Sequence, residues 1–242
     1  MRIPRFFCPE LSLEQTTILL PETVHRHAIQ VLRLKTGAEI RLFNGEGLEY
    51  EARLTEVQKR QSQAELGQKL TKQAESPLNI TLLQGISRGE RMDYAIQKAV
   101  ELGVNTIIPV ITERCNVQFS GDRADKRYAH WHGVMTSACE QSGRCFLPTL
   151  AAVTTLDTVI NQADSDLKLV LDPEANTGFG QLQKPRNLTL LIGPEGGLTN
   201  IEIAQAQTGG FTAVQFGPRI LRTETASTAA LAVVQTLWGD LG

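Results

Sequence analysis

The sequence predicts an α/β fold with a mostly parallel sheet, preceded by a smaller β-rich module. From Leu78 onward, short apolar runs alternate with amphipathic stretches of helical length, a pattern typical of parallel strands connected by helices. Near the start of the chain, short alternating runs surround a glycine-rich turn. The 242 residues suffice for one large or two small domains, and we expect a division into residues 1–75 and 76–242.

The first module is expected to contain a short helix and a β-hairpin. Thr23 is a candidate helix cap and Gly37 a candidate helix end, and between them apolar residues recur at helical spacing, at Val24, Ala28, Val31 and Leu32. Residues 38–44 and 48–57 then flank Gly45-Glu46-Gly47, which indicates a hairpin. The polar segment 58–76 shows no clear period and has room for one further strand.

The second part alternates strands and helices. The predicted strands are residues 80–85, 106–111, 167–171, 188–192 and 213–216, and the predicted helices are about 92–102, 125–139, 201–207 and 226–237. Thr199 and Glu202 have the spacing of a capping box, and Gly209-Gly210 supplies a helix stop.

The composition excludes several classes of protein. The net charge is −2, from 24 Lys and Arg against 26 Asp and Glu, so no overall positive field attracts polyanions and any nucleic-acid contact must be local. No apolar stretch approaches the roughly 20 residues of a membrane span, and the N-terminus lacks the apolar core of a signal peptide. We therefore expect a cytoplasmic protein with no membrane partner.

The cysteine and histidine patterns predict neither a disulfide framework nor a metal site. The four cysteines include no CxxC pair, so we interpret them as free thiols. The histidines form two pairs, His25/His27 and His130/His132, whose two-residue spacing points the rings to different faces of a helix. No GxSxG elbow is present for a nucleophilic serine.

Two strand-to-helix loops are candidate ligand-binding segments. Residues 188–199 run from an apolar strand through five residues, Gly193 to Gly197, into the capped helix, and residues 216–226 follow a similar plan with Gly217-Pro218. Ligands of α/β sheets bind at the carboxyl ends of strands, where glycines allow close backbone approach. The first segment has neither the lysine of a phosphate loop nor GxGxxG spacing, so a tight turn without a ligand is an equally weighted interpretation.

Arg222 and Glu224 lie at the entrance of the last predicted helix. A purely structural interpretation makes Thr223 the cap and lets Glu224 complement the helix dipole. It explains Arg222 poorly, because a cation beside the positive end of a helix is locally unfavourable. We therefore expect an anionic group, a carboxylate or a phosphate, to share this site.

Four arginines follow the ends of predicted elements, at Arg88, Arg91, Arg114 and Arg144. If these ends share one face, the arginines form a phosphate-binding edge in an otherwise acidic domain, which suits RNA better than a small metabolite. The alternative is that some of them are solvated surface residues paired with Glu113 and Glu140.

Several segments of the chain carry the motifs of a known family. They are QGISRGERMDYAIQKAVELGV (84–104), ERC (113–115), EQSGR (140–144), IGPEGGLTNIE (192–202) and FGPRILRTETA (216–226), with IPRFF and HAIQVLRLKTG (27–37) near the N-terminus. They resemble the small-subunit ribosomal RNA uracil-N3 methyltransferases of the SPOUT superfamily, over nearly the whole chain. The resemblance implies a PUA-like β-barrel RNA-binding domain over residues 1–75 and, over 76–242, a SPOUT methyltransferase domain with a C-terminal trefoil knot, a feature that periodicity does not reveal.

The resemblance also implies a cofactor and partners. S-adenosylmethionine (SAM) would bind in the knot, held by backbone groups of the glycine loops, and the matching residues here are Leu171, Ile192, Gly193, Gly197, Phe216, Gly217, Ile220 and Leu221. A homodimer is implied, in which the second subunit completes the active site. The implied substrate is a uridine of 16S ribosomal RNA, expected within the assembled small subunit.

The implied reaction transfers a methyl group from a sulfonium to N3 of uracil. Because N3 carries a proton, this proton must leave before or during attack, and a nearby cation would stabilise the charge that develops on O2 or O4. Arg222 is the candidate for that role, and Glu224 either holds Arg222 in place or accepts the proton. The RNA phosphates are expected to contact arginines of both domains, at Arg5, Arg33, Arg88, Arg91, Arg114 and Arg144.

Two other functions compete with this one. A non-catalytic RNA-binding protein would use the β-rich module to bind and the α/β domain to dimerise, and it would not bind SAM. An enzyme acting on a small phosphorylated metabolite would leave the first module and the scattered arginines without an evident use.

Overall fold

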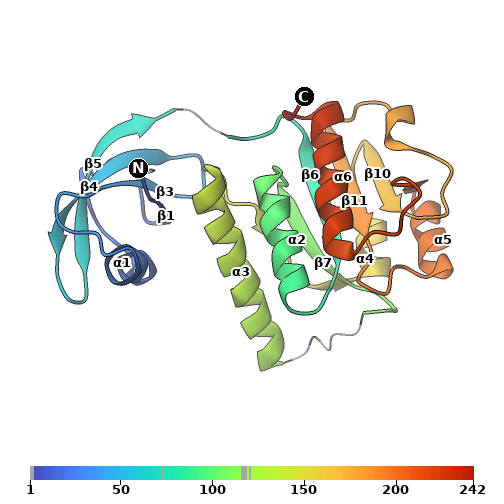
Figure 1. Ribbon diagram of the computed structural model, residues 1–242, viewed down its shortest axis with the longest axis horizontal. Coiled ribbons are helices and arrows are strands. Elements are labelled where there is room, and N and C mark those ends of the chain that lie inside the picture. The colour runs from blue at the N-terminus through green and yellow to red at the C-terminus, as the bar shows by residue number, and fades with distance from the viewer. Residues whose placement is uncertain (1–2, 72–73, 116–118, 120) are drawn as a thin grey trace. The chain divides into compact units, whose positions relative to one another are not determined.

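The computed structural model describes residues 3–71, 74–115, 119 and 121–242, which divide into two compact units (Figure 1). The first unit comprises Met1–Glu75 together with Cys139–Leu147, and the second comprises Ser76–Ala138 and Pro148–Gly242. Residues 139–147 lie beyond the boundary expected at residue 75, and no sequence pattern associates them with the first unit.

The first unit is built on a five-stranded sheet in the order β1-β3-β4-β5-β2. β1 is parallel to β3, and the other neighbours are antiparallel. The predicted hairpin is confirmed as β3 and β4, and the polar segment after it supplies β5. The strands are Arg5–Phe7 (β1), Thr17–Leu19 (β2), Glu39–Phe43 (β3), Glu49–Val57 (β4) and Ser62–Leu70 (β5).

The alternating residues of β4 form one side of the core of this unit. Ala52 and Leu54 are buried, as is Leu48 just before the strand, and Tyr50 packs partly buried against the same cluster. Each fully buried leucine contributes about 1.5–3 kcal/mol relative to an exposed one. Burial of every second side chain therefore determines which face of this strand packs against the core.

The helix of the first unit differs from the predicted one. An α-helix spans Glu22–His25 (α1) and continues as a π-helix over Arg26–Val31, and no side chain caps its start. Val31 and Leu32 are 65% and 43% exposed, because the wider π-helix rotates them away from the face expected at 3.6 residues per turn. The helix ends well before Gly37, and Arg33 follows it with φ of +56°.

A buried ion pair holds residues 139–147 in the first unit. Arg5 Nε donates to Glu49 Oε1 over 2.6 Å, and the other Arg5 nitrogens donate to the carbonyls of Cys139 (2.8 Å) and Arg144 (3.1 Å). Arg144 Nη2 in turn pairs with Glu75 Oε2 over 2.7 Å. Removing one partner of a buried pair costs about 3–5 kcal/mol, so these contacts explain why the segment belongs here.

The cysteines are free thiols, as predicted, and three of them are buried. Burial raises the pKa of the Cys8, Cys139 and Cys145 thiols to about 12. These three side chains are therefore neutral at physiological pH, and the Cys145 thiol donates to Glu49 Oε2 over 3.0 Å.

The second unit contains the predicted parallel sheet, in the order β12-β10-β11-β6-β7-β8, and β9 also pairs with β7. All of its strand pairs are parallel. The strands are Asn79–Gly85 (β6), Thr106–Ile111 (β7), Thr149–Leu150 (β8), Thr154–Thr155 (β9), Leu167–Leu171 (β10), Asn187–Ile192 (β11) and Thr212–Val214 (β12).

Helices cover both faces of this sheet. They are Glu90–Glu101 (α2), Leu156–Gln162 (α4), Asn200–Thr208 (α5) and Thr223–Trp238 (α6), with a 3₁₀ turn at Phe179–Gln181. A further helix, Asp122–Ser142 (α3), belongs to the second unit up to Ala138 and to the first unit from Cys139. α2 and α6 pack together over one face, and α4 and α5 cover the other (Figure 1). Thr199 and Glu202 form the predicted capping box of α5. Among the described residues, no helix is long and apolar enough to cross a membrane.

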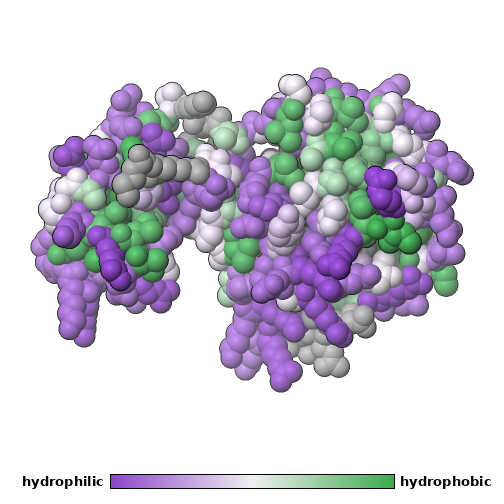
Figure 2. Space-filling model, in the orientation of Figure 1, coloured by the Kyte–Doolittle hydropathy of each residue, from purple (hydrophilic) through white to green (hydrophobic). Residues whose placement is uncertain are grey.

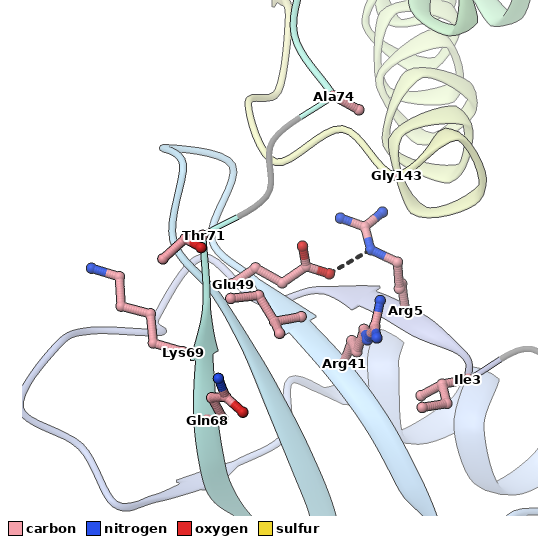
Figure 3. A pocket seen from close by; sticks show the side chains of 10 residues that line it. Ile3, Arg5, Arg41, Glu49, Gln68, Lys69, Thr71, Ala74 and Gly143 are labelled. Atoms are coloured by element: carbon pink, nitrogen blue, oxygen red, sulfur yellow. Dashed lines mark hydrogen bonds and ion pairs between the residues drawn. The ribbon is translucent and has the colours of Figure 1, made fainter.

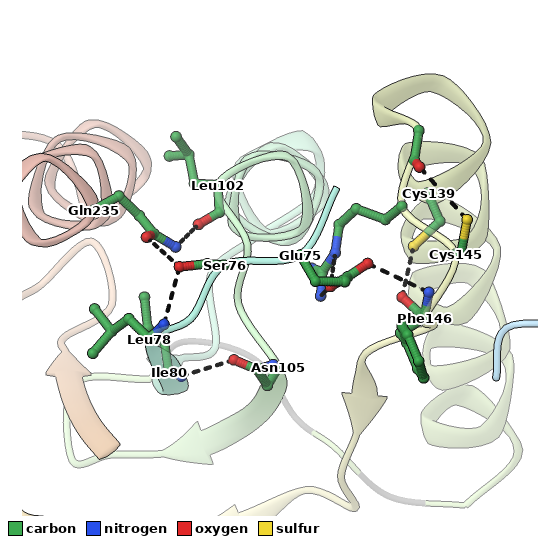
Figure 4. Close-up of polar contacts among 12 residues, drawn as sticks. Glu75, Ser76, Leu78, Ile80, Leu102, Asn105, Cys139, Cys145, Phe146 and Gln235 are labelled. Atoms are coloured by element: carbon green, nitrogen blue, oxygen red, sulfur yellow. Dashed lines mark hydrogen bonds and ion pairs between the residues drawn. The ribbon is translucent and has the colours of Figure 1, made fainter. Parts of the chain in front are cut away.

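Polar side chains fix the beginning of the second unit. Ser76 Oγ donates to Gln235 Oε1 over 2.7 Å, and Gln235 Nε2 donates to the Leu102 carbonyl over 2.7 Å (Figure 4). Asn105 Oδ1 accepts the Ile80 N–H over 2.8 Å. These bonds tie the first strand of the sheet to helices α2 and α6.

Candidate functional site

A cavity of about 400 Å³ lies at the carboxyl ends of β10, β11 and β12 in the second unit. Parallel α/β sheets bind their ligands at this edge. Its walls include the two glycine loops, which we define as loop A (residues 193–198) and loop B (residues 216–222). All eight residues that the resemblance associates with the cofactor line it, namely Leu171, Ile192, Gly193, Gly197, Phe216, Gly217, Ile220 and Leu221.

Loop A is held by hydrogen bonds to its backbone. Arg114 Nη1 donates to the carbonyls of Gly196 (2.9 Å) and Leu198 (3.4 Å). Gly197 N–H donates to the Pro194 carbonyl over 2.9 Å. Gly197 has φ of +70°, in the left-handed region that favours glycine. Loop A therefore keeps its shape through its own turn and through Arg114.

Two further glycines let the backbone of loop A pack closely. A Cβ on Gly85, at the end of β6, would lie 2.5 Å from Pro194 N, and a Cβ on Gly193 would lie 2.9 Å from Leu198 N. Both distances are shorter than real Cβ atoms show, so a larger residue at either position would displace the backbone. Gly85 and Gly193 are thus needed for the close packing of loop A.

Glu195 ties loop A to the start of α2. Its Oε1 accepts the Arg88 backbone N–H over 2.8 Å and pairs with Arg91 Nη1 over 3.0 Å. Partial burial raises the pKa of the Glu195 carboxyl, but these hydrogen bonds outweigh burial, and the pKa lies below its ordinary value. Glu195 is therefore a carboxylate at neutral pH.

Loop B has fewer contacts. Phe216 meets the ring of Phe179 edge-on, with ring centroids 5.6 Å apart. Beyond it, the side chains of Arg219, Ile220 and Arg222 are exposed, with Ile220 at 88%. Gly217 has φ of +69° and open space where a side chain would lie. The exposed part of loop B is thus available to a ligand or a partner.

Arg222 and Glu224 lie on either side of the first residue of α6. Thr223 does not cap the helix, contrary to the structural interpretation, because its hydroxyl donates instead to the Gly193 carbonyl. No ion pair joins Arg222 to Glu224 in the described part of the chain. Glu224 Oε2 is shielded from solvent and has no hydrogen-bond partner among the described residues. A donor from a bound molecule would relieve the cost of that buried oxygen.

The sequence did not predict a series of buried hydrogen bonds next to loop A. Ser227 Oγ donates to Gln84 Oε1 (2.5 Å), Gln84 Nε2 donates to Thr223 Oγ1 (3.1 Å), and Thr223 Oγ1 donates to the Gly193 carbonyl (2.7 Å). Gln84 and Ser227 are fully buried. The one pattern that could have drawn attention to Gln84 is its polarity at the end of the apolar run Ile80–Leu83.

Three of the predicted RNA-binding arginines gather around loop A. Arg88 and Arg91 reach it through Glu195, and Arg114 binds its carbonyls directly. The alternative expectation was that some of these arginines are solvated surface residues paired with Glu113 and Glu140. Their contacts in loop A are with other groups, namely Glu195 and the Gly196 and Leu198 carbonyls.

Arg5 and Arg144 are buried, so their placement gives no support to the predicted contacts with RNA. Their side chains are 6% and 3% exposed, and they pair with Glu49 and Glu75 inside the first unit. A buried, paired guanidinium would have to break its ion pair to reach a phosphate. Arg33 is exposed, and its contact with RNA stays a prediction.

A second cavity, of about 610 Å³, lies within the first unit (Figure 3). The Arg5–Glu49 pair lines it, and Arg41 and Lys69 add two further cations. Lys69 is exposed, and Arg41 Nε is shielded from solvent without a hydrogen-bond partner in the described ranges. The lining therefore carries a net positive charge that suits an anionic group.

No group of three or more His, Cys, Asp or Glu side chains in the described residues is placed to hold a metal ion. One ring of each histidine pair has a local partner instead. His25 Nδ1 lies 2.5 Å from Ser62 Oγ, and His130 Nε2 lies 2.8 Å from Asp93 Oδ2.

Comparison with known proteins gives matches along the whole chain. A family model described as an RNA methyltransferase domain matches residues 74–235, and one described as an RNA methyltransferase PUA domain matches residues 20–67. A Buchnera aphidicola relative named ribosomal RNA small subunit methyltransferase E is 35% identical, over 99% of this chain and 98% of its own. The Bacillus subtilis protein of the same name is 29% identical, over 95% of each chain.

Two solved structures share this fold along their full length. Ribosomal RNA small subunit methyltransferase E of Neisseria gonorrhoeae, bound to S-adenosyl methionine, is 45% identical with a TM-score of 0.93 and coverage of 100% of both chains. A Legionella pneumophila protein with bound SAM is 38% identical with a TM-score of 0.97 and the same coverage of 100%. The predicted PUA-like and methyltransferase domains are both confirmed, and the chain belongs to the RNA methyltransferase family.

Proposed function

We propose that this chain uses SAM to methylate N3 of a specific uridine in 16S ribosomal RNA of the small ribosomal subunit. The observation that carries the proposal is the cavity between loops A and B, which collects all eight residues that match the family's cofactor residues. The two similar solved structures hold SAM, and curated relatives are named for the small-subunit ribosomal RNA. Action on ribosomal RNA would place the protein in the cytoplasm.

The residues of the cavity fit a cofactor of this size and charge. A volume of about 400 Å³ lies within the range of small-molecule sites. Gly193, Gly196 and Gly197 line the cavity without side chains, so loop A presents backbone to a ligand. Ile192 and Ile203 supply apolar walls, and Asp172 and Glu174 supply carboxylates that suit a cationic ligand.

The proposed chemistry uses Arg222 and Glu224. When bound, SAM supplies an activated methyl group on a positively charged sulfur. Glu224 accepts the N3 proton of uracil, and its solvent-shielded Oε2, which lacks a donor among the described residues, supports this role. Arg222 donates to uracil O2 or O4 and stabilises the developing negative charge. The electron pair left on N3 forms the bond to the methyl carbon as the sulfur–carbon bond breaks.

RNA recognition is proposed to use both units. In the first unit, Arg33 and the cavity cations Arg41 and Lys69 replace the buried Arg5 as candidates for phosphate contact. In the second unit, the arginines around loop A are the candidates, namely Arg88, Arg91 and Arg114. Contacts of this kind predict binding that weakens steeply as salt concentration rises.

We further propose a homodimer. Ile220, Leu237 and Leu241 are 88%, 46% and 54% exposed, and Figure 2 shows apolar surface over α6. These residues lie at both ends of α6, and exposed apolar side chains of this size are commonly covered by a partner. Light scattering coupled to size-exclusion chromatography should give about twice the chain mass of 26.6 kDa, and the monomer mass would contradict this proposal.

The trefoil knot is likewise a proposal. It is supported by the family resemblance. A knotted C-terminus predicts slow refolding from denaturant, because threading must precede packing of the last helix. Refolding in milliseconds would contradict it.

The function is tested by incubating the purified protein with SAM that carries a labelled methyl group. The substrates are intact small subunits and naked 16S RNA from cells that lack the protein. We expect label in N3-methyluridine at one position, with more incorporation into intact subunits. Label on another base or on ribose would contradict the proposed target atom. Absence of SAM binding would favour the non-catalytic RNA-binding alternative.

A further inference from the structure

We propose that Gln84 is a positioning residue for the cofactor site, which acts through Thr223 to hold the Gly193 carbonyl and so fixes loop A against the start of α6. The proposal rests on the proposed function, because SAM is the ligand whose binding it concerns. Gln84 is fully buried and is not part of the cavity lining. Any effect of Gln84 on SAM must therefore pass through other residues.

The surroundings of the Gln84 amide fix its orientation. Its Nε2 lies 3.1 Å from the Gly85 carbonyl, which can only accept, so the nitrogen must face that oxygen. Oε1 then faces Ser227 Oγ, and Nε2 directs its second hydrogen to Thr223 Oγ1. The oxygen and both N–H groups are used, in a position that is 0% exposed.

Thr223 transmits this orientation to loop A. A threonine hydroxyl has one proton, and because Oγ1 accepts from Gln84, that proton is directed to the Gly193 carbonyl 2.7 Å away. Gly193 is part of the cavity wall, so holding its carbonyl sets how the next peptide groups face the ligand. Consecutive hydrogen bonds in a buried site strengthen one another, so loss of one weakens the rest.

Three elements meet at this amide. Gly85, the neighbour of Gln84 in β6, approaches Pro194 of loop A so closely that a Cβ would lie 2.5 Å from Pro194 N. Ser227 lies one turn along α6 from Thr223, and its Oγ is also 2.9 Å from the Thr223 carbonyl. A displaced Gln84 therefore shifts loop A and the start of α6, two walls of the cavity, together.

Gln84→Met is the direct test, because methionine has a similar volume and no amide. We expect calorimetry to show SAM affinity reduced about tenfold, the size of effect that loss of a buried hydrogen bond produces. Thr223→Val should cause a similar reduction. Thr223→Ser keeps the hydroxyl and should stay within about threefold of the parental affinity. Thr223 itself lines the cavity, so only the contrast between loss of its hydroxyl in Thr223→Val and its retention in Thr223→Ser bears on the hydrogen bond, and this contrast decides the matter if Gln84→Met fails to fold.

Thr189→Val is the matched control. Thr189 lies in β11, is 2% exposed, and its Oγ1 shares a hydrogen bond of 2.7 Å with Ser165 Oγ. It lies outside the cavity lining. The same loss of a buried hydroxyl should lower the melting temperature about as much as Thr223→Val does, and should leave the Kd for SAM unchanged.

A double variant shows whether Gln84 and Thr223 affect SAM affinity through one series of hydrogen bonds or independently of each other. If Gln84 acts through Thr223, the Kd of Gln84→Met/Thr223→Val should equal that of the weaker-binding single variant. Multiplied losses, or parental SAM affinity in Gln84→Met or in Thr223→Val, would overturn the proposal. Failure of the unmodified chain to bind SAM would contradict the proposed function itself.

Discussion

Loops A and B begin alike, each with a strand that leads into Gly-Pro, at Gly193-Pro194 and Gly217-Pro218, yet they differ in how the fold supports them. Loop A is held by Arg114, by Glu195 and by the Thr223 hydroxyl. The side chains of loop B beyond Phe216 are largely exposed. Loop A is thus fixed by contacts within the protein, whereas loop B has few such contacts and is expected to become ordered when a ligand or partner binds.

This division has an energetic basis. Segments with few buried contacts and exposed backbone open at low free energy, and ligand-binding segments are commonly drawn from them. Loop B ends at Arg222, so the residue proposed to stabilise charge lies on the less supported wall. Variants in the two loops should therefore differ in which step of the reaction they affect.

The largest expected effect is that of Arg222→Ala in loop B. The methylation rate should fall by roughly 10² to 10³, as for loss of one charge-stabilising donor, while SAM affinity changes little. Arg222→Lys should restore the rate only in part, because it keeps the charge but not the planar fork. Single-turnover methylation at saturating SAM measures this. Arg186→Ala, at an exposed position of the second unit, is the control, and a parental rate for Arg222→Ala would remove the role.

Gly197→Val in loop A should act on binding instead. Both Gly197 and Gly217 have positive φ, +70° and +69°, and an L-residue in this region costs roughly 1–2 kcal/mol. A Cβ on Gly197 would meet only Arg114 Nη1, at 4.0 Å, but hydrogen bonds from Arg114 and Thr223 restrain the backbone of loop A. Gly197→Val should therefore weaken SAM binding by at least about tenfold and lower the melting temperature. Gly217→Val should lower the melting temperature less. Equal losses of melting temperature in the two variants would contradict the proposed difference in support.

Arg114→Ala tests the hydrogen bonds that hold loop A. Loss of the donors to Gly196 and Leu198 should raise the Kd for SAM about threefold to tenfold, a modest effect because the side chain is largely in solvent. Arg53→Ala is a matched control, since the Arg53–Glu39 pair is 62% exposed on both sides. If calorimetry finds the same Kd for Arg114→Ala and the parent, loop A does not depend on this arginine.

The smallest expected effect is that of Glu195→Gln. The pKa of Glu195 is lowered in the folded chain, so its stabilising contribution is complete above the ordinary pKa of 4.5 and is lost as pH falls through the lowered value. We expect the variant to melt about 1–3 °C below the parent at pH 7. This difference in melting temperature should remain down to pH 5 and disappear under more acidic conditions. A difference in melting temperature that does not narrow at any acidic pH at which both chains still fold would show that the carboxylate charge is not its cause.

The sheet of the second unit could be predicted because its long strands are apolar runs. β6, β7, β10 and β11 are each expected from such a run. The two-residue strands β8 and β9 are too short to show a period, and α4, Leu156–Gln162, is barely two turns long. β12 ends at Val214 rather than at residue 216, because the apolar Phe216 serves loop B and not the sheet.

The site could be predicted only where the residue type depends on the local backbone conformation or on close packing of the backbone. Glycine is such a residue type, and loops A and B were found in this way. Contacts between distant residues leave no local pattern: Gln84 meets Ser227 across 143 positions, and Arg5 meets the Cys139 carbonyl across 134. That is why the sequence reveals neither the burial of Arg5 nor the contacts of Gln84.

Amide hydrogen exchange of the two loops, with and without SAM, tests the central claim most directly. Without SAM, the amides of loop A should exchange slowly and those of loop B rapidly. Saturating SAM should slow exchange in loop B by at least about tenfold, and should change loop A much less. Similar exchange of both loops in the free chain, or no slowing of loop B with SAM bound, would contradict the account of a prebuilt wall and a wall completed by the ligand.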